Sequence, residues 1–165
     1  MTDLRTARLV LHPVDVAEAE RIVARRAGPT DSWADDFPFE GDVVGASVFL
    51  RASAERGGQQ PFGFYRLTRL DDGHAVGGIG FKGPPANGRV EIGYGLAPSA
   101  RGEGLAAEAV SAVVALASSL HVSQVLASTA ADNVASQQTL LHAGFALTKS
   151  DAELRYYEID LRVGH

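Results

Sequence analysis

Cysteine is absent from the 165-residue sequence, and its absence excludes several kinds of chemistry. The chain can form no disulfide framework and no thiolate metal site, and it can use neither a cysteine nucleophile nor an acyl-cysteine intermediate. Histidine is sparse as well, and the five histidines lack the spacing of metal ligands: His12, His74, His121, His142 and His165. We therefore expect no metal site.

The sequence also lacks a net positive charge and long hydrophobic runs. The formal net charge is −5 at pH 7, whereas a nucleic-acid partner normally requires a basic face. No apolar run reaches the roughly 18 to 20 residues that a membrane-spanning helix needs, and the first ten residues carry charge where a signal peptide has its apolar core. We expect no nucleic-acid partner, no membrane partner and a cytoplasmic location. The acidic balance suits a cationic small molecule or a basic peptide.

What the sequence does contain is typical of one globular domain spanning residues 1–165. Hydrophobic residues make up 45% of the chain and charged residues 21%, which at this length suffices for a real core. Strands are predicted over 8–13, 62–70, 74–83, 89–98, 122–129, 145–150 and 155–161, and helices over 15–28, 42–56, 104–121 and 133–144. Asp15 is the expected cap of the first helix, Gly28 its end, and Gly144 the end of the last. This order predicts an α+β domain of about seven strands and four helices.

The stretch GIGFKG, residues 78–83, matches the G-x-G-x-x-G dinucleotide fingerprint letter for letter. That fingerprint works only where a helix begins inside it, so that free N–H groups and the positive end of the helix face a pyrophosphate. Here Pro84 and Pro85 follow, and then another expected strand. We therefore interpret these glycines as strand residues that permit a bulge or close packing, and a nucleotide-binding role as the least supported hypothesis.

A second glycine motif passes the test that the first one fails. The stretch RGEGLA lies between an expected strand and a long expected helix, and comprises Arg101, Gly102, Glu103, Gly104, Leu105 and Ala106. Its small residues leave the N–H groups of the first helical turn uncovered, and the helix end adds about half a positive charge. The arginine can add a charge-assisted bond to a phosphate. These features predict a phosphate cradle; the alternative is a loop whose glycines only make a tight turn.

The motif Arg101-x-x-Gly104-x-Ala106 resembles the Q/R-x-x-G-x-G/A signature of the GNAT N-acetyltransferase superfamily, and its neighbours extend the likeness. The stretch VEIGYGLAPSARGEGLAAEAV is similar to that family's fourth strand, pyrophosphate loop and third helix in unbroken order. DNVASQQTLLHAGF is similar to a segment that contacts the cofactor. TARLVLHP and VGGIGFKGPP are similar to the Rim-type branch, whose members acetylate the amino termini of ribosomal proteins. The likeness covers nearly the whole chain and is weakest over residues 14–60.

The resemblance implies a fold, a co-substrate and a reaction. The sheet would be mixed, mostly antiparallel and twisted, with splayed fourth and fifth strands. Acetyl-coenzyme A would give its acetyl group directly to a primary amine, either a peptide amino terminus or a small amine. Its pantetheine arm would bond to backbone near Leu96 and Pro98, while Asn133 and Ser136 would reach the arm from the opposite side. From the residues alone, Asn133 is a helix cap and Ser136 the third helical residue, and both interpretations can hold together.

Two catalytic features of the Rim-type relatives are missing. Leu140 stands where some members have a general-acid tyrosine, and Ser128 stands where some have a glutamate. Glu91 lies near the place of a base glutamate in other members, on a strand face whose glycines leave room for a substrate. Glu91 is therefore the candidate general base; the alternative is a solvated or salt-bridged carboxylate. Tyr94 is interpreted as a packing residue. A non-catalytic, coenzyme A-binding regulatory module stays open as a second function.

Acceptor specificity in this superfamily resides largely in the first two helices and the loop that joins them. Here that loop carries acidic groups beside aromatic rings, in Trp33, Asp35, Asp36 and Phe37. Such groups would attract a protonated amine through charge and cation–π contact. The alternative is a hydrated loop with Trp33 tucked into the core.

Overall fold

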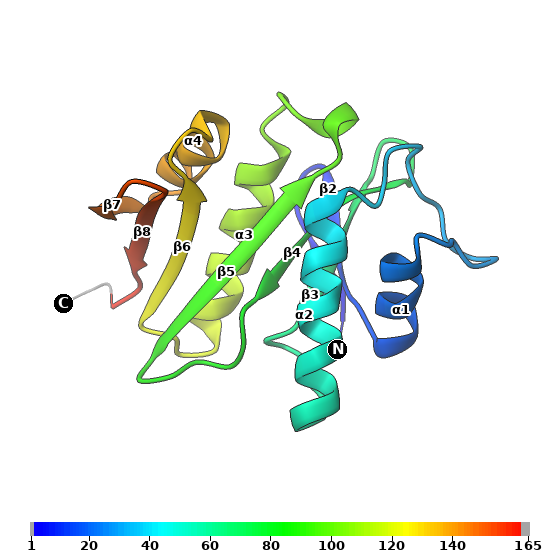
Figure 1. The fold of residues 1–165 in the computed structure, drawn as a ribbon, viewed down its shortest axis with the longest axis horizontal. Helices are drawn as coiled ribbons and strands as arrows, with labels where there is room; N and C mark the ends of the chain where they lie inside the picture. Colours follow the sequence, from blue (N-terminus) through cyan, green and yellow to red (C-terminus); the bar gives the residue numbers. More distant parts are fainter. Residues whose placement is uncertain (1, 163–165) are drawn as a thin grey trace.

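The computed structural model describes residues 2–162, and its centre is an eight-stranded sheet (Figure 1). His165 lies outside the described residues. The strands lie in the order β1-β2-β3-β4-β5-β6-β8-β7. Their bounds are β1 (Leu4–Arg5), β2 (Leu9–Pro13), β3 (Phe64–Arg69), β4 (Ala75–Phe81), β5 (Arg89–Leu96), β6 (Gln124–Ala130), β7 (Ala146–Ser150) and β8 (Leu154–Asp160). Neighbouring strands are antiparallel except β5 and β6, which are parallel.

Within residues 2–162, four α-helices cover the two faces of this sheet. On one face α1 (Val16–Ala24) packs against α2 (Glu40–Arg56), and α2 lies across β3, β4 and β5. On the other face α3 (Leu105–Ser119) contacts β2 and β5 and packs against α4 (Val134–His142). The buried positions of α3 recur every three or four residues, as one face of a helix requires, at Leu105, Ala109, Val110, Val113 and Ala117.

The expected α+β class and mostly antiparallel sheet are confirmed, and the strand count differs by one. The additional strand is β1, which pairs only two residues with β2 and is too short to show an alternating pattern. The last helix is capped as expected: the backbone N–H of Ser136 donates to Oδ1 of Asn133 at 3.1 Å. Gly144 follows the end of α4 with a φ of 96°, which a glycine adopts without strain.

Two helix boundaries differ from the sequence prediction. The first helix begins after its expected cap Asp15, but it does not run to Gly28. Arg25 ends it instead, in the left-handed conformation, with its N–H directed at the carbonyls of Arg21 and Ile22. The second helix begins at Glu40 and not at residue 42, because the Asp42 carboxylate accepts a bond from the N–H of Phe39 at 2.9 Å and so caps an earlier turn.

The splay expected between the fourth and fifth predicted strands lies between β5 and β6. The two strands pair only at their beginnings, where Arg89, Val90 and Glu91 face residues 124–126. β5 then continues to Leu96 beside β4, while β6 pairs along its whole length with β8. The beginnings of α3 and α4 lie near the separated ends of β5 and β6 (Figure 1). This arrangement positions the candidate site.

The glycines of the rejected dinucleotide motif serve close packing, as interpreted from the sequence. They belong to β4 and to the turn after it, and the chain then enters β5 with no helix between. A Cβ on Gly78 would lie 2.3 Å from Cζ of Phe64, and one on Gly45 of α2 would lie 2.5 Å from Cε1 of the same ring. The absence of side chains at both positions lets the Phe64 ring fit between helix and sheet.

Among residues 2–162, no helix combines the length and the apolar composition that crossing a membrane requires.

Candidate functional site

The loop before α3 has the conformation that its glycines were expected to allow. Gly102 and Gly104 have φ angles of 85° and 80°, which side chains rarely tolerate. Gly104 is also the N-cap of α3, and no side chain of the described chain caps that helix. The first-turn N–H groups of α3 therefore lack an intrahelical acceptor and point outward at the positive end of the helix. The tight-turn interpretation therefore holds for these glycines, while the phosphate cradle stays a prediction.

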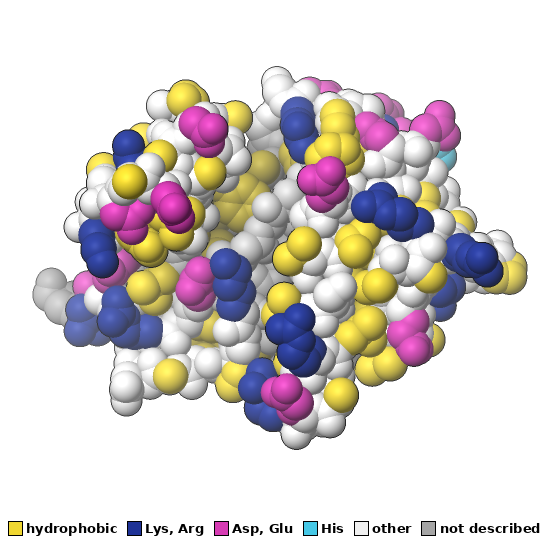
Figure 2. Space-filling model, viewed as in Figure 1, with side chains coloured by type: hydrophobic (Ala, Val, Ile, Leu, Met, Phe, Trp, Pro, Cys, Tyr) yellow, Lys and Arg dark blue, Asp and Glu magenta, His cyan; other side chains and the backbone are white. Residues whose placement is uncertain are grey.

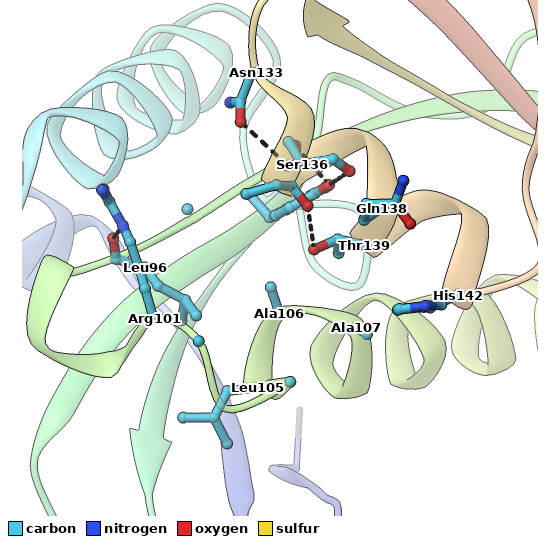
Figure 3. A pocket seen from close by; sticks show the side chains of 15 residues that line it. Leu96, Arg101, Leu105, Ala106, Ala107, Asn133, Ser136, Gln138, Thr139 and His142 are labelled. Atoms are coloured by element: carbon cyan, nitrogen blue, oxygen red, sulfur yellow. Dashed lines mark hydrogen bonds between the residues drawn. The ribbon is translucent and has the colours of Figure 1, made fainter.

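A pocket of about 450 Å³, which we call the α3 pocket, opens between this helix start and α4 (Figure 3). Most of the predicted cofactor residues line it. From β5, the loop and α3 come Leu96, Arg101, Gly102, Gly104, Leu105 and Ala106, and from the beginning of α4 come Asn133 and Ser136. Pro98 and Glu103 are not among its lining residues: Pro98 begins the 3-10 turn, and the Glu103 carbonyl accepts a bond from Arg8 Nη1 at 2.7 Å.

Sequence reasoning missed one wall of the α3 pocket, which is a face of α4. Its residues recur with the three- and four-residue spacing of one helical face, at Ala135, Gln138, Thr139 and His142. That spacing was readable in the sequence. The family motif includes only Asn133 and Ser136 of this segment, so it does not indicate the rest of the face.

The predicted phosphate ligand Arg101 has other contacts here. Its Nε donates to the Leu96 carbonyl at 3.1 Å (Figure 3). Its guanidinium lies 5.1 Å from the centre of the Phe39 ring. The same Leu96 carbonyl belongs to the backbone that the family resemblance assigns to the pantetheine arm. A bond from Arg101 to a phosphate stays a prediction.

A second arginine, which sequence reasoning missed, supports the cradle. Arg8 donates through its backbone N–H and its Nε to the Glu108 carboxylate, at 2.8 and 2.9 Å, and a Cβ on Gly104 would lie 3.5 Å from Arg8 Nη2. Burial disfavours the ionised form of Glu108, but hydrogen bonds from Thr6 and Arg8 outweigh it and lower the pKa of that carboxyl. The first strands are therefore tied to the start of α3, and the Arg8 guanidinium, paired with Glu108, lies beside the loop.

A second pocket, of about 340 Å³, lies between α2 and strands β4 and β5; we call it the α2 groove. Its glycines are Gly41 and Gly45 on the helix and Gly78, Gly80 and Gly93 on the strands. Its larger side chains are mostly apolar and aromatic: Val44, Val48, Phe49, Phe64, Phe81, Ile92 and Tyr94. Figure 2 shows the face that carries α2. This face is hollowed beside the part of the molecule that contains α4, and hydrophobic side chains lie along α2.

The two pockets meet at a hydrogen-bonded pair of side chains. Tyr94 and Ser136 line both pockets, and their hydroxyls are 2.8 Å apart. The Tyr94 hydroxyl also donates to the Ser136 carbonyl at 3.1 Å. Burial raises the pKa of Tyr94, and the bond with Ser136 only partly offsets that effect. Tyr94 thus packs, as expected, but it also brings a protonated hydroxyl to the junction of the two pockets.

Glu91, the candidate base, lies beyond the residues that line either pocket. It shares a face of β5 with Gly93, as expected from strand alternation, and Gly93 lies in the α2 groove. Its Oε2 is 2.9 Å from Lys82 Nζ, and its side chain is 43% exposed. The salt-bridged alternative therefore describes this arrangement, while a role in catalysis stays a prediction.

None of the four predicted residues of the acidic aromatic loop lines either pocket. Trp33 packs edge-on against the buried ring of Phe37, with ring centroids 5.3 Å apart. Asp36 accepts bonds from the side chain and the backbone N–H of Ser99, which lower its pKa. Asp35 is exposed. The loop thus holds the turn after β5, and its attraction of an amine stays a prediction.

Leu140 and Ser128, which stand where some relatives have catalytic residues, lie in different surroundings. Leu140 is fully buried in the core. Ser128 of β6 lines the α2 groove. Within the described residues, no group of three or more potential ligands of the kind His, Asp or Glu is placed to hold a metal ion.

Comparisons with known proteins show the family to which the chain is related. A family model, the acetyltransferase (GNAT) domain, matches residues 8–146. The chain is 33% identical over 167 residues to the uncharacterized N-acetyltransferase YjdG of Bacillus subtilis (strain 168), covering 95% of this chain and 97% of that protein. Among solved structures, the acetyltransferase from Agrobacterium tumefaciens str. C58 has a TM-score of 0.67 at 23% identity, over 96% of this chain and 94% of that chain.

A Rim-type enzyme is also among the structural neighbours. RimL, a ribosomal L7/L12 alpha-N-protein acetyltransferase in complex with coenzyme A, has a TM-score of 0.66 at 15% identity, over 96% of this chain and 98% of that chain. The structural likenesses establish the fold, while the family model and the curated relative extend over most of the sequence. The chain therefore belongs to the GNAT family and is an acetyltransferase.

Proposed function

We propose that this acetyltransferase moves the acetyl group of acetyl-coenzyme A directly to the nitrogen of a primary amine. The observation that carries the proposal is that the α3 pocket and the α2 groove share Tyr94 and Ser136 at the splay between β5 and β6. Two substrates, one in each pocket, would meet at that pair, and holding both in reach converts a bimolecular reaction into an effectively unimolecular one. Direct transfer needs no enzyme nucleophile, which suits a chain without cysteine.

The α3 pocket suits the coenzyme. The first-turn N–H groups of α3 would receive the pyrophosphate, and no heavy atom lies within 4 Å of a Cβ built on Gly102, so the loop leaves that side open. Asn133 and Ser136 would contact the pantetheine arm from α4. Arg8 would add positive charge beside the loop. The RimL structure, which holds coenzyme A, supports the assignment by likeness of fold alone.

When bound, acetyl-coenzyme A supplies an acetyl thioester whose carbonyl carbon can accept a neutral amine. As the carbon–nitrogen bond forms and the carbon–sulfur bond breaks, the sulfur keeps the electron pair and the nitrogen gives up one proton. Tyr94 would return a proton to the sulfur, since its hydroxyl lies at the junction of the two pockets. Glu91 would take the proton lost by the amine through water, from the outer end of the α2 groove.

Turnover with an amine panel tests the proposal. Released coenzyme A and acetylated amine are measured together, by thiol titration and mass spectrometry. We expect amine-dependent release of one coenzyme A for each amine acetylated. Calorimetric binding of coenzyme A without amine-dependent release would instead support the regulatory module.

A further inference from the structure

We infer that the α2 groove selects a small primary amine carried on a compact aromatic body, and discriminates against diamines and polyamines. The inference rests on the proposed function, because it names the acceptor class of that same site. It narrows what the net charge and the acidic loop suggested, which was a cationic acceptor, to a molecule with one ammonium group and no second positive charge. The groove itself, and not the overall charge, decides what can lie beside the junction.

The charge of the groove argues against a second ammonium group. The one charged residue among its lining residues in the described chain is Lys82. Its Nζ is paired with Glu91 at 2.9 Å, at the outer end of the strand face. The acidic loop residues Asp35 and Asp36 are not in the groove, and Asp36 is bonded to Ser99. The Asp42 carboxylate is packed behind Gly78, but it is buried, with 2% of its surface exposed, and it does not line the groove. A diamine lying in the groove would therefore place its second charge among apolar side chains or beside the Lys82–Glu91 pair, whose charges already compensate each other, and neither placement stabilises it.

The walls of the groove suit an aromatic ring. Phe49, Phe64 and Phe81 are buried in the protein, with 5 to 7% of their surface exposed, yet each contributes to the groove. Across from α2, Gly80 and Gly93 are cross-strand partners. A Cβ on Gly80 would lie 3.0 Å from Cδ1 of Phe64 and one on Gly93 would lie 3.2 Å from Cε of Lys82, so the Phe64 ring and the aliphatic part of Lys82 cover these glycines and form the floor. A flat ligand ring can lie on such a floor and meet the phenylalanines edge to face, the geometry that aromatic pairs prefer.

The size and rim of the groove favour a small molecule. Its volume of about 340 Å³ lies toward the lower end of the range for small-molecule pockets. At its rim, α2 presents Val44 and Val48, which are 63% and 36% exposed. Exposed valines at the mouth of the groove extend the apolar surface that the apolar part of an acceptor can contact. They offer no hydrogen-bonding side chains for a peptide backbone.

The test compares two acceptors of similar amine basicity. 2-Phenylethylamine carries one amine on an aromatic body, and 1,4-diaminobutane carries two on an aliphatic chain. With saturating acetyl-coenzyme A, we expect kcat/KM for 2-phenylethylamine to exceed that for 1,4-diaminobutane at least tenfold. A ratio of one or less would overturn the inference.

A specificity switch tests the groove itself. Val48→Glu introduces a carboxylate on the groove wall, and we expect it to lower kcat/KM for 2-phenylethylamine about tenfold, to raise that for 1,4-diaminobutane, and to leave coenzyme A affinity unchanged. Val16→Glu is the matched control, because Val16 is also an exposed helical valine, 47% exposed, but lies on α1 outside the groove. If Val48→Glu fails to fold, Val44→Glu at the more exposed position replaces it. An unchanged acceptor ratio in the folded variant would overturn the inference.

The outcomes separate this inference from the proposed function. Transfer to the diamine in preference to the aromatic amine overturns the acceptor class and leaves amine acetylation standing. Transfer to neither amine, nor to any other amine of the panel, overturns both together. Calorimetric titration of the coenzyme A complex with N-acetyl-2-phenylethylamine gives a readout apart from activity: we expect the parent to bind it and Val48→Glu to bind it at least tenfold more weakly.

Discussion

The α3 pocket and the α2 groove adjoin at one pair of side chains but are built differently. The α3 pocket depends on backbone: two glycines with positive φ and uncapped N–H groups at a helix start. The α2 groove depends on side-chain volume: glycines and phenylalanines contributed by a helix and three strands. Backbone recognition of a phosphate tolerates many flanking sequences. Shape recognition changes with each side chain, so the groove is where members of one fold can diverge in acceptor.

The hydroxyl of Tyr94 is where the two regions meet, and its removal should have the largest effect. Tyr94→Phe keeps the ring and deletes the group proposed to protonate the leaving sulfur. We expect kcat to fall about a hundredfold, in the range of general-acid contributions, and the coenzyme A dissociation constant to change less than threefold. Steady-state kinetics and calorimetry measure the two quantities.

Tyr156→Phe is the matched control for Tyr94→Phe. Tyr156 lies on β8, bonded to Asp151 and outside both pockets, so its loss should leave kcat near the parent value. An unchanged kcat in Tyr94→Phe would leave the junction with a packing role only.

Gly104→Val tests the backbone-built side alone. The side chain would occupy the cradle, and we expect coenzyme A to bind one to two orders of magnitude more weakly, a loss of roughly 1.4 to 2.8 kcal/mol. Because valine is strained at a φ of 80° wherever it stands, Gly73→Val is the control: Gly73 has a φ of 72° in a turn outside both pockets. Both variants should lose stability in thermal unfolding. If Gly104→Val binds coenzyme A as tightly as Gly73→Val does, the phosphate cradle lies elsewhere.

Glu91→Gln tests the outer end of the groove and should have a smaller effect. The substitution keeps the shape and removes the charge. We expect turnover at neutral pH to fall about tenfold and to recover partly as pH rises, because only about one aliphatic amine in a thousand is neutral at pH 7. The ion pair with Lys82 and the exposure of the side chain favour this modest magnitude. A pH–rate profile that superimposes on that of the parent would remove Glu91 from the mechanism.

Asp42 is a buried carboxylate packed beside the groove, and we expect it to affect how the free energy of unfolding depends on pH. Burial raises its pKa to about 6, against the opposing bond from the Phe39 N–H and the charge of Arg25. The folded state then binds this proton more tightly than the unfolded state, so the contribution of Asp42 to stability is greatest at low pH and falls as pH rises through 6. Between pH 5 and 7.5 this amounts to about 1 kcal/mol. Asp42→Asn should remove that dependence in chemical denaturation at the two pH values; an equal pH slope in both proteins would contradict the assignment.

The parts of the site that could be predicted are those in which neighbouring residues act together. The loop from Arg101 to Ala106 is contiguous, so its glycines and the helix after it could be interpreted in one stretch. Asn133 and Ser136 were likewise found as a local cap, three residues apart. The splay of β5 and β6, by contrast, followed from the family resemblance, because no local pattern encodes where two strands stop pairing.

The α2 groove could not be predicted, because its residues come from separate elements and most are ordinary core types. Phe64 gains its role from Gly45 and Gly78, which lie far from one another in sequence and become neighbours only through tertiary packing. The same limit applies to the acidic loop: nothing local to Asp36 indicates that Ser99, in another loop, supplies its hydrogen bonds. Charge beside aromatic residues suggested binding, whereas distant partners determine what those residues contact.

The central claim, that the two pockets form one continuous path past Tyr94 and Ser136, is tested most directly by calorimetry with a bisubstrate analogue. In this compound the sulfur of coenzyme A is joined through an acetyl linker to the nitrogen of 2-phenylethylamine. Two continuous sites predict binding at least tenfold tighter than coenzyme A alone, with the gain lost in Val48→Glu and the coenzyme contribution lost in Gly104→Val. An analogue that binds no tighter than coenzyme A would contradict the claim.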